Sequence, residues 1–252
     1  MPLDVRVFET TEQMALAAAH DASSLIREAV AHHGEARIVV ATGNSQLAFI
    51  DALTSVPDLP WHTVTVFHMD EYSALPATHP ASFRRWIRER VGDRVDPKIV
   101  HYLDGESPDL ATECARYAAL LNEAPLDLTF AGIGENGHIA FNDPHEADFN
   151  DPATVKLVNL DEACRRQQTG EGHFPTLEDV PRQALTMTCP ALMRARHLVC
   201  CVPESRKAAA VKAALEGPVT EACPASLLRT HRSARLYLDR DSAALLSDPD
   251  LR

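Results

Sequence analysis

Short apolar runs alternate with amphipathic stretches along most of the chain. The runs favour strands, and they occur at 38–41, 64–67, 126–131 and 198–202. The stretches between them space their apolar residues as helices do, at 82–91, 109–123 and 204–216. Apolar strands separated by helices are typical of a parallel sheet that is covered on both faces. The pattern therefore predicts an α/β fold with a mostly parallel sheet.

A long helix is expected before the first of these runs. Thr10 and Gln13 have the spacing of a capping box, in which the threonine side chain accepts a backbone N–H of the first turn. Apolar residues then recur at near-helical spacing as far as Gly34, a residue type that commonly ends helices. We therefore expect one helix between Thr10 and Gly34.

The segment 145–182 is the weakest part of the pattern. It combines many charges with prolines and glycines, namely Pro152, Gly170, Gly172, Pro175 and Pro181. We expect a long, mobile excursion over one end of the sheet. It can serve as a lid, as long irregular segments often do, or it can be a decorated surface loop. No linker or repeat divides the chain, so residues 1–252 are expected to form a single domain.

Composition limits the classes of binding partner and the cellular compartment that we expect. The net charge of −12 disfavours broad binding to nucleic acid or to an anionic membrane surface. The six cysteines contain no C-x-x-C pair and are expected to be buried free thiols. The N-terminus has no signal-peptide core, and no apolar stretch approaches the roughly 18 residues of a membrane span. A cytoplasmic protein with no membrane partner is expected.

Three loops that follow predicted strands carry polar groups. In an open parallel sheet the carboxyl ends of the strands meet at one crevice, so such loops converge there. The first, 41–46, leads from a strand into a helix, and its backbone N–H groups with the hydroxyls of Thr42 and Ser45 can hold an anion. The same residues also suit a turn that only caps the helix, so both interpretations stand.

The second loop offers a pair of carboxylates, Asp70 and Glu71, directly after the run 64–67. Either residue can cap the next turn. Apolar neighbours such as Phe67 and Met69 can instead raise the pKa of a carboxyl by desolvation, which suits a base that removes a proton from carbon. The sequence leaves both roles open.

The third loop has glycines at 132, 134 and 137, the spacing of a dinucleotide-binding fingerprint. We reject that interpretation because Asp143 and Pro144 follow where a long helix would be needed, and residues before proline resist helix. The glycines then allow a small ligand to approach the backbone. His138 becomes a candidate proton shuttle, with Asn136 and Asp143 placed to orient its ring.

A metal site is the alternative use of these side chains. His68, Asp70, His138 and Asp143 could supply nitrogen and oxygen ligands. Their spacing matches no known metal motif, and they are distributed over separate loops. We therefore expect no metal.

The segments 67–72 and 132–144 together resemble the glucosamine-6-phosphate deaminases, also called glucosamine/galactosamine-6-phosphate isomerases. The motifs occur in the family's order, and a looser similarity extends from about residue 5 to about residue 240. The resemblance implies a Rossmann-like three-layer α/β/α domain and a reaction without metal or other cofactor. The substrate would be a small amino-sugar phosphate, which is converted with water to fructose 6-phosphate and ammonia. A homo-oligomer is possible.

The resemblance also implies a role for each site residue. His138, supported by Asn136 and Asp143, would open the sugar ring, and Asp70 would move a proton from C2 to C1. The phosphate would be held by Lys207 and by a turn made of Thr42, Gly43, Asn44 and Ser45.

The chain departs from the family at several of these positions. Asn136 and Asp143 stand where many members have Asp and Glu, and the turn is bulkier at residues 44–46. An arginine expected near residue 168 is absent, and Arg165 and Arg166 are the nearest substitutes. The preferred hexosamine stays open.

Two other functions compete with deamination. A hydrolase that resembles the 6-phosphogluconolactonases would share the fold and the glycine–histidine loop. Such hydrolases usually carry arginine where this chain has Tyr72, and Thr-Ala-Ser-Leu where it has 139–142. The altered turn at 44–46 also permits a protein that binds a sugar phosphate without turning it over.

Overall fold

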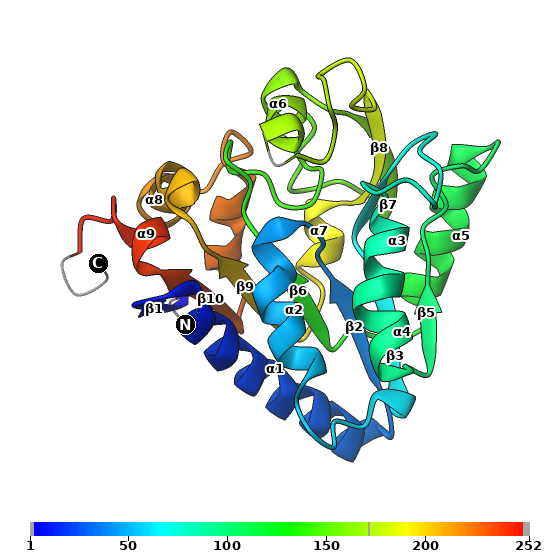
Figure 1. Ribbon diagram of the computed structural model, residues 1–252, viewed down its shortest axis with the longest axis vertical. Coiled ribbons are helices and arrows are strands. Elements are labelled where there is room, and N and C mark those ends of the chain that lie inside the picture. Colours follow the sequence, from blue (N-terminus) through cyan, green and yellow to red (C-terminus); the bar gives the residue numbers. More distant parts are fainter. Residues whose placement is uncertain (1–2, 171, 249–252) are drawn as a thin grey trace.

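In residues 3–170 and 172–248, which the computed structural model describes, seven parallel strands form the central sheet (Figure 1). Their order across the sheet is β1 (Asp4–Phe8), β10 (Ala234–Asp239), β9 (His197–Val202), β6 (Leu128–Ala131), β2 (Ala36–Val40), β3 (Val64–His68) and β5 (Ile99–His101). The four apolar runs are the four adjacent strands β9, β6, β2 and β3, so the predicted parallel sheet is confirmed.

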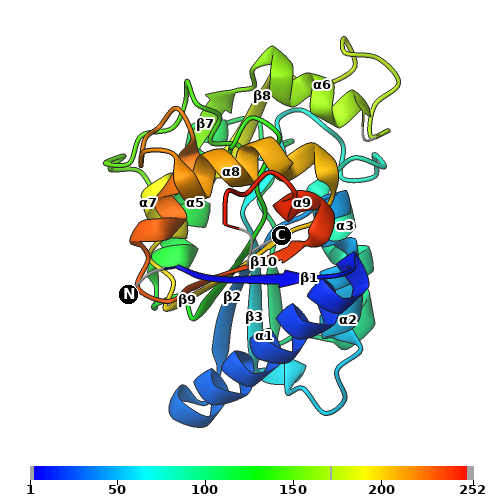
Figure 2. The same cartoon turned by 90° about the vertical axis from the view of Figure 1, so that its left-hand side faces the viewer.

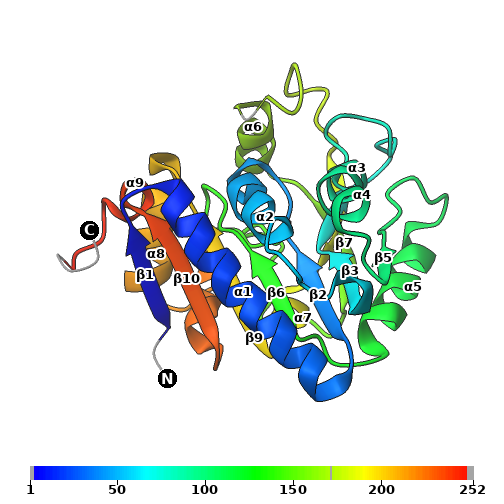
Figure 3. The ribbon, with the colours of Figure 1, turned by 60° about the horizontal axis from the view of Figure 1, so that its bottom comes forward.

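Helices cover both faces of this sheet. On one face lie α1 (Thr11–His33) and α2 (Leu47–Thr54), which cross in front of the strands in Figure 3. The other face is covered by α5 (Leu110–Asn122), α7 (Cys189–Leu192) and α8 (Ala208–Glu216). Successive strand side chains point to opposite faces, so Val40 packs under the first layer and Val39 under the second. The three-layer α/β/α architecture is therefore confirmed.

The expected helices form with small changes at their ends. Thr10 accepts a hydrogen bond from the Gln13 backbone N–H at 3.2 Å, and Gly34 ends α1 with a positive φ of 82°. The stretch predicted as one helix at 82–91 is instead α3 (Phe83–Ile87), a π-helical turn η3 (Arg88–Gly92) and α4 (Asp93–Val95). The remaining short elements are the 3₁₀ turns η1 (Asn44–Gln46), η2 (Trp61–Thr63), η4 (Ser205–Lys207) and η5 (Pro224–Thr230), and α9 (Arg240–Ala243). No helix in the described ranges has the length and apolar content needed to cross a membrane.

A second, antiparallel sheet lies beyond one end of the first. It consists of β4 (Asp70–Tyr72), β8 (Gln183–Met187) and β7 (Val155–Asn159), and α6 (Glu162–Gly170) follows β7. Figures 1 and 2 show α6, β7 and β8 together above the main sheet. The segment 145–182, which we expected to be a long, mobile excursion over one end of the sheet, contains the strand β7 and the helix α6. Its strand is fixed by pairing with β8, a long-range contact that local composition does not show.

Candidate active site

The polar loops converge on one open cavity beyond the carboxyl ends of the strands. Its lining includes two of the predicted catalytic residues, Asp70 and His138. It also includes every predicted substrate-binding residue, namely Thr42, Gly43, Asn44, Ser45 and Lys207. The remaining two predicted residues, Asn136 and Asp143, contact the backbone and the ring of His138, respectively.

Asp70 is a buried carboxyl at the start of β4. It is 6% exposed, and its Oδ1 atom has no hydrogen-bond partner among the described residues. Burial raises the pKa of Asp70 well above its ordinary value of 3.8, and the nearby charge of Glu71 raises it further. A carboxylate that is neither neutralised nor hydrogen-bonded is basic and costly to bury, which is the condition expected of a group that accepts protons.

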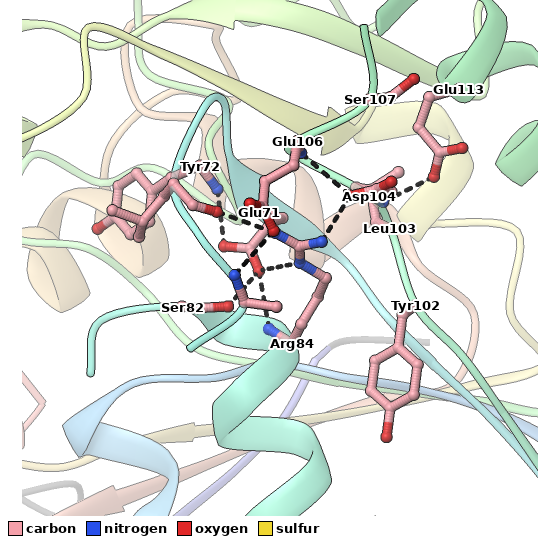
Figure 4. A network of polar contacts seen from close by, with 12 residues as sticks. Glu71, Tyr72, Ser82, Arg84, Tyr102, Leu103, Asp104, Glu106, Ser107 and Glu113 are labelled. Atoms are coloured by element: carbon pink, nitrogen blue, oxygen red, sulfur yellow. Dashed lines mark hydrogen bonds and ion pairs between the residues drawn. The ribbon is translucent and has the colours of Figure 1, made fainter. Parts of the chain in front are cut away.

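Glu71, the next residue, accepts backbone N–H groups at the start of α3, beside the N-cap residue Ser82. Its carboxylate accepts hydrogen bonds from the Ser82 hydroxyl at 2.9 Å, from the Phe83 N–H at 3.1 Å and from the Arg84 N–H at 2.8 Å. Figure 4 shows this carboxylate enclosed by the start of α3. Glu71 therefore satisfies the backbone at a helix start, while the pKa of Asp70 is raised as a base would require.

The Arg84 side chain fastens this region to the loop after β5. Its Nε lies 3.2 Å from a Glu71 oxygen, and its two terminal nitrogens contact Asp104 and Glu106 (Figure 4). The guanidinium is thus paired with three carboxylates while its side chain is only 10% exposed. Such a network holds β4, and with it the Asp70 backbone, in one position.

His68 is held in a single neutral form. Its Nδ1 donates to the Asp70 backbone oxygen at 2.8 Å, and its Nε2 accepts from the Leu103 N–H at 2.9 Å. Burial lowers the pKa of His68 to about 4. Both ring nitrogens are committed to the backbone, so the metal alternative loses this ligand.

Two other groups of side chains bring possible donor atoms within 4.8 Å of one another. They are His138, Asp143 and Cys164, and Asp143, His145 and Asp161. In the first group, burial raises the pKa of the Cys164 thiol.

The glycine loop brings its backbone against the His138 ring. A Cβ atom added to Gly134 would lie 2.2 Å from the ring, so this position accepts only glycine without displacing the histidine. Gly137 has a φ of +85°, a conformation that also favours glycine. Within the described ranges the next helix after Gly137 is α6, so the helix of a dinucleotide fingerprint does not follow this loop.

The His138 ring stands beside a fully buried carboxylate. His138 Nδ1 lies 3.1 Å from Asp143 Oδ1, at ion-pair distance but off the line of a regular hydrogen bond. Asn136 donates to the same oxygen at 3.0 Å and accepts from the His138 N–H at 3.1 Å. Burial raises the pKa of Asp143, but the His138 ring and the Asn136 amide outweigh it, and the pKa falls below its ordinary value. Asp143 is therefore an anion that can orient the imidazole.

The turn 41–46 and Lys207 approach the same cavity from two helix starts. The turn passes through Gly43, with a φ of 94°, into η1 and α2. Lys207 ends η4 just before α8 and is only 2% exposed. The backbone of Glu204 in this second turn has a φ of 82°, and its N–H donates to the Asp239 carboxylate.

The sequence prediction missed the contribution of α6. Gln167 and Gln168 line the cavity where an arginine was sought. Of the two substitutes, Arg165 donates to the backbone oxygens of Leu177 and Val180, and Arg166 pairs with Glu162 at the surface. The sequence did contain one signal that this helix turns a face toward the protein. Cys164 and Gln168 are four residues apart, which puts them on one helix face, and both are buried.

The fold and this site define the class: a three-layer α/β protein whose crevice beyond the strand ends is lined by a carboxyl, an imidazole, a buried lysine and a glycine turn at a helix start. Residues 9–237 match the family of glucosamine-6-phosphate isomerases/6-phosphogluconolactonase, and the chain belongs to this family.

Among its relatives, the glucosamine-6-phosphate deaminase of Bacillus thuringiensis strain Al Hakam is 35% identical over 246 residues, which is 98% of this chain and 90% of the relative. A solved monomeric glucosamine-6-phosphate deaminase superposes with a TM-score of 0.89 at 28% identity, covering 96% of this chain and all of that one. A 6-phosphogluconolactonase from Shewanella baltica OS155 has the same fold, with a TM-score of 0.78 at 19% identity over 94% of this chain and 97% of that one.

Proposed function

We propose that this protein is a glucosamine-6-phosphate deaminase. It would convert glucosamine 6-phosphate or galactosamine 6-phosphate, with water, to the ketose 6-phosphate and ammonia. The similarity of full-length deaminases supports this assignment. The observation that carries it is the buried, unpaired Asp70 carboxyl, which lines the same cavity as His138.

The first step opens the sugar ring. His138 takes the proton from the C1 hydroxyl and delivers one to the ring oxygen as the C1–O5 bond breaks. The anionic Asp143 stabilises the imidazolium that forms between these transfers, and Asn136 holds the carboxylate in place.

The second step moves a proton between carbons. Asp70 removes the C2 proton, the electron pair forms the C1–C2 double bond, and the C1 carbonyl pair moves to O1, which takes a proton from the C2 ammonium group of the substrate to give an enolamine. Asp70 then returns the proton to C1, which leaves an imine at C2. Water adds to that carbon, ammonia departs, and the ketose phosphate remains. Each positioned proton transfer is typically worth about 10²- to 10⁴-fold in rate.

The phosphate would be held by the turn from Thr42 to Ser45 and by Lys207. The turn offers backbone N–H groups and two hydroxyls, and the buried ammonium supplies positive charge in an otherwise acidic protein. Replacing the ammonium by an amide in Lys207→Gln is expected to raise KM for the sugar phosphate about 10-fold or more, since charged hydrogen bonds contribute about 1.5–3 kcal/mol. Steady-state kinetics test this, and an unchanged KM would remove Lys207 from the site.

The assignment is tested by mixing the purified protein with each hexosamine 6-phosphate and measuring ammonia and ketose phosphate together. Equal amounts of both products are expected, with nearly none from an Asp70→Asn variant. The same preparations are offered 6-phosphogluconolactone. Hydrolysis of the lactone without ammonia from either hexosamine would make the protein a lactonase, and binding without any turnover would make it a sugar-phosphate-binding protein.

We also propose that 145–182 is the lid of a single-domain enzyme. Gln167 and Gln168, which lie within it, line the cavity. A homo-oligomer and a cytoplasmic location stay predictions, which the mass of the protein in solution and cell fractionation test.

A further inference from the structure

The carboxylate beside His138 has a second carboxylate as its neighbour. Asp161 lies just before α6, and its Oδ2 atom is 3.4 Å from the Asn136 amide nitrogen. The same nitrogen is 3.0 Å from Asp143 Oδ1. One amide group therefore donates to two carboxylates, which uses both of its N–H bonds.

Asp161 contacts the catalytic region through its backbone as well. Its N–H points to Asp143 Oδ2 at 3.3 Å, so each oxygen of the Asp143 carboxylate has a donor. Its own Oδ1 accepts the Cys164 N–H at 2.6 Å, which is the standard cap of a helix start. Asp161 thus contacts the partners of His138 and also begins the helix whose later residues line the cavity.

That helix is fastened to the cavity at its other end. Gln168 accepts a hydrogen bond from the Tyr72 hydroxyl at 2.6 Å, and Gln167 accepts one from the Glu135 N–H at 3.1 Å. The position of α6 and the orientation of the His138–Asp143 pair therefore depend on one small set of polar contacts.

We propose that Asp161 is a positioning residue that couples α6 to the His138–Asp143 pair through the Asn136 amide. The expected effect on kcat rests on the proposed function, whereas the expected effect on the orientation of the His138 ring does not. When α6 is in place, Asp161 fixes the Asn136 amide and one oxygen of Asp143, and the imidazole faces an oriented carboxylate. When α6 moves away, both contacts are lost and the catalytic pair is free to rotate.

The coupling also gives a physical reason for Asn at position 136. The carboxylates of Asp143 and Asp161 both lie beside the side chain of residue 136. An aspartate at 136 would be a third carboxylate, which would add repulsion and leave no hydrogen-bond donor between the other two. An asparagine amide supplies two N–H groups there without adding charge.

The test separates the two functions of Asp161, which are to cap α6 and to hold the Asn136 amide. In Asp161→Asn the side-chain oxygen must accept the Cys164 N–H to keep the helix cap, so the new NH₂ group faces the NH₂ group of Asn136. Two donors then meet, and the coupling is lost while the cap remains, since Asn caps helices as well as Asp. Asp161→Ser also keeps a cap without the carboxylate and carries the same test if the first variant does not fold.

The kinetic expectation is a fall in kcat of about 10-fold or more at nearly constant KM, because misplaced catalytic groups act on the chemical step. Asp161→Ala removes the cap too, so it should also raise KM and speed hydrogen exchange in α6. The matched control is Asp109→Asn, the same change at the exposed cap of α5, which should leave kcat and KM unchanged.

A second measurement needs no substrate. The ¹⁵N signals of the His138 ring report the surroundings of Nδ1, and they should shift in Asp161→Asn and stay in place in Asp109→Asn. Unaltered kcat and ring signals in a folded Asp161→Asn protein would overturn the coupling, as would a change in KM or stability alone. If the wild-type protein releases no ammonia but the ring signals shift, the coupling stands and the proposed function fails.

Discussion

Replacing Asp70 by asparagine should lower activity and raise stability at the same time. The wild-type protein buries this carboxyl at 6% exposure and leaves its Oδ1 atom without a hydrogen bond. That arrangement favours proton abstraction and disfavours folding. An amide of nearly the same shape cannot act as the base, and it carries no charge to desolvate.

The two effects have different sizes. Loss of a positioned general base typically costs about 10²- to 10⁴-fold in kcat. A buried unsatisfied polar group costs about 1–3 kcal/mol, and more when it is charged. The amide of Asp70→Asn is still buried and keeps part of that cost, so we expect a net gain of about 1–2 kcal/mol. Each kcal/mol corresponds to about 2–4 °C in Tm for a chain of this size.

The pH dependence fixes the cause of the stability gain. The pKa of Asp70 is raised in the folded state above its ordinary value of 3.8. Below pH 3.8 the carboxyl is therefore neutral in both the folded and the unfolded wild-type protein, and its burial costs no charge desolvation. As the pH rises from there to the folded-state pKa, the unfolded chain ionises first and the wild-type protein loses stability. The advantage of the variant should therefore grow over that interval and then stay constant. Activity of the wild-type protein should rise through the folded-state pKa, as the base becomes available.

Denaturant unfolding from pH 3.5 to pH 8 measures the change in stability, and ammonia release from the same preparations measures the change in activity. The range begins near the ordinary pKa of 3.8, where the stability difference should be smallest. The control is Asp109→Asn, where the carboxyl is exposed and the activity and stability should stay near those of the wild-type protein. A variant that is less stable than the wild-type protein at pH 7, or that keeps its kcat, would refute the reasoning.

Gly134→Ala should fold but lose about 100-fold in kcat, because the new Cβ would lie 2.2 Å from the His138 ring and must displace it. Thermal unfolding and kinetics measured beside Gly170→Ala, whose added carbon meets nothing within 4 Å, separate this effect from a general response to alanine. Glu71→Gln should destabilise the protein by about 3 kcal/mol, the lower end for breaking a buried ion pair, because Arg84 keeps two other acidic partners. Denaturant unfolding measures this loss, and a change below about 0.5 kcal/mol would contradict the role of the network.

The parts of the fold that could be predicted from the sequence are those with a strong local signal. The four central strands are apolar because both of their faces are covered, and α1 has a side-chain cap and a terminal glycine. The second sheet had no such signal. β4 has only three residues, and β7 and β8 are held by pairing between distant segments. The pairing energy of a strand depends on its partner, which no local pattern contains.

The residues of the candidate site also fall into those that the sequence predicted and those that it did not. The loops at strand ends were found because the topology of a parallel sheet brings them to one crevice, and the structure places all of them there. The contributions of Asp161, Gln167 and Gln168 were missed because their hydrogen bonds to other site residues span at least 18 positions of the chain, to residues such as Asn136, Asp143 and Tyr72. The dinucleotide interpretation of the glycine loop was correctly rejected, since it depended on a helix that Pro144 disfavours.

The division of labour between Asp70 and Glu71 follows from the periodicity of a strand. Successive side chains on β4 point to opposite faces, so adjacent carboxyls enter different surroundings. Asp70 and Tyr72 share the face toward the cavity and α6, where Tyr72 reaches Gln168. Glu71 takes the other face, where backbone N–H groups and Arg84 saturate it. A one-residue shift of β4 against β8 would exchange these positions, placing Asp70 in the hydrogen-bonded network and Glu71 in the cavity. The register of this short strand against Ala184, Leu185 and Thr186 therefore decides which carboxyl is basic.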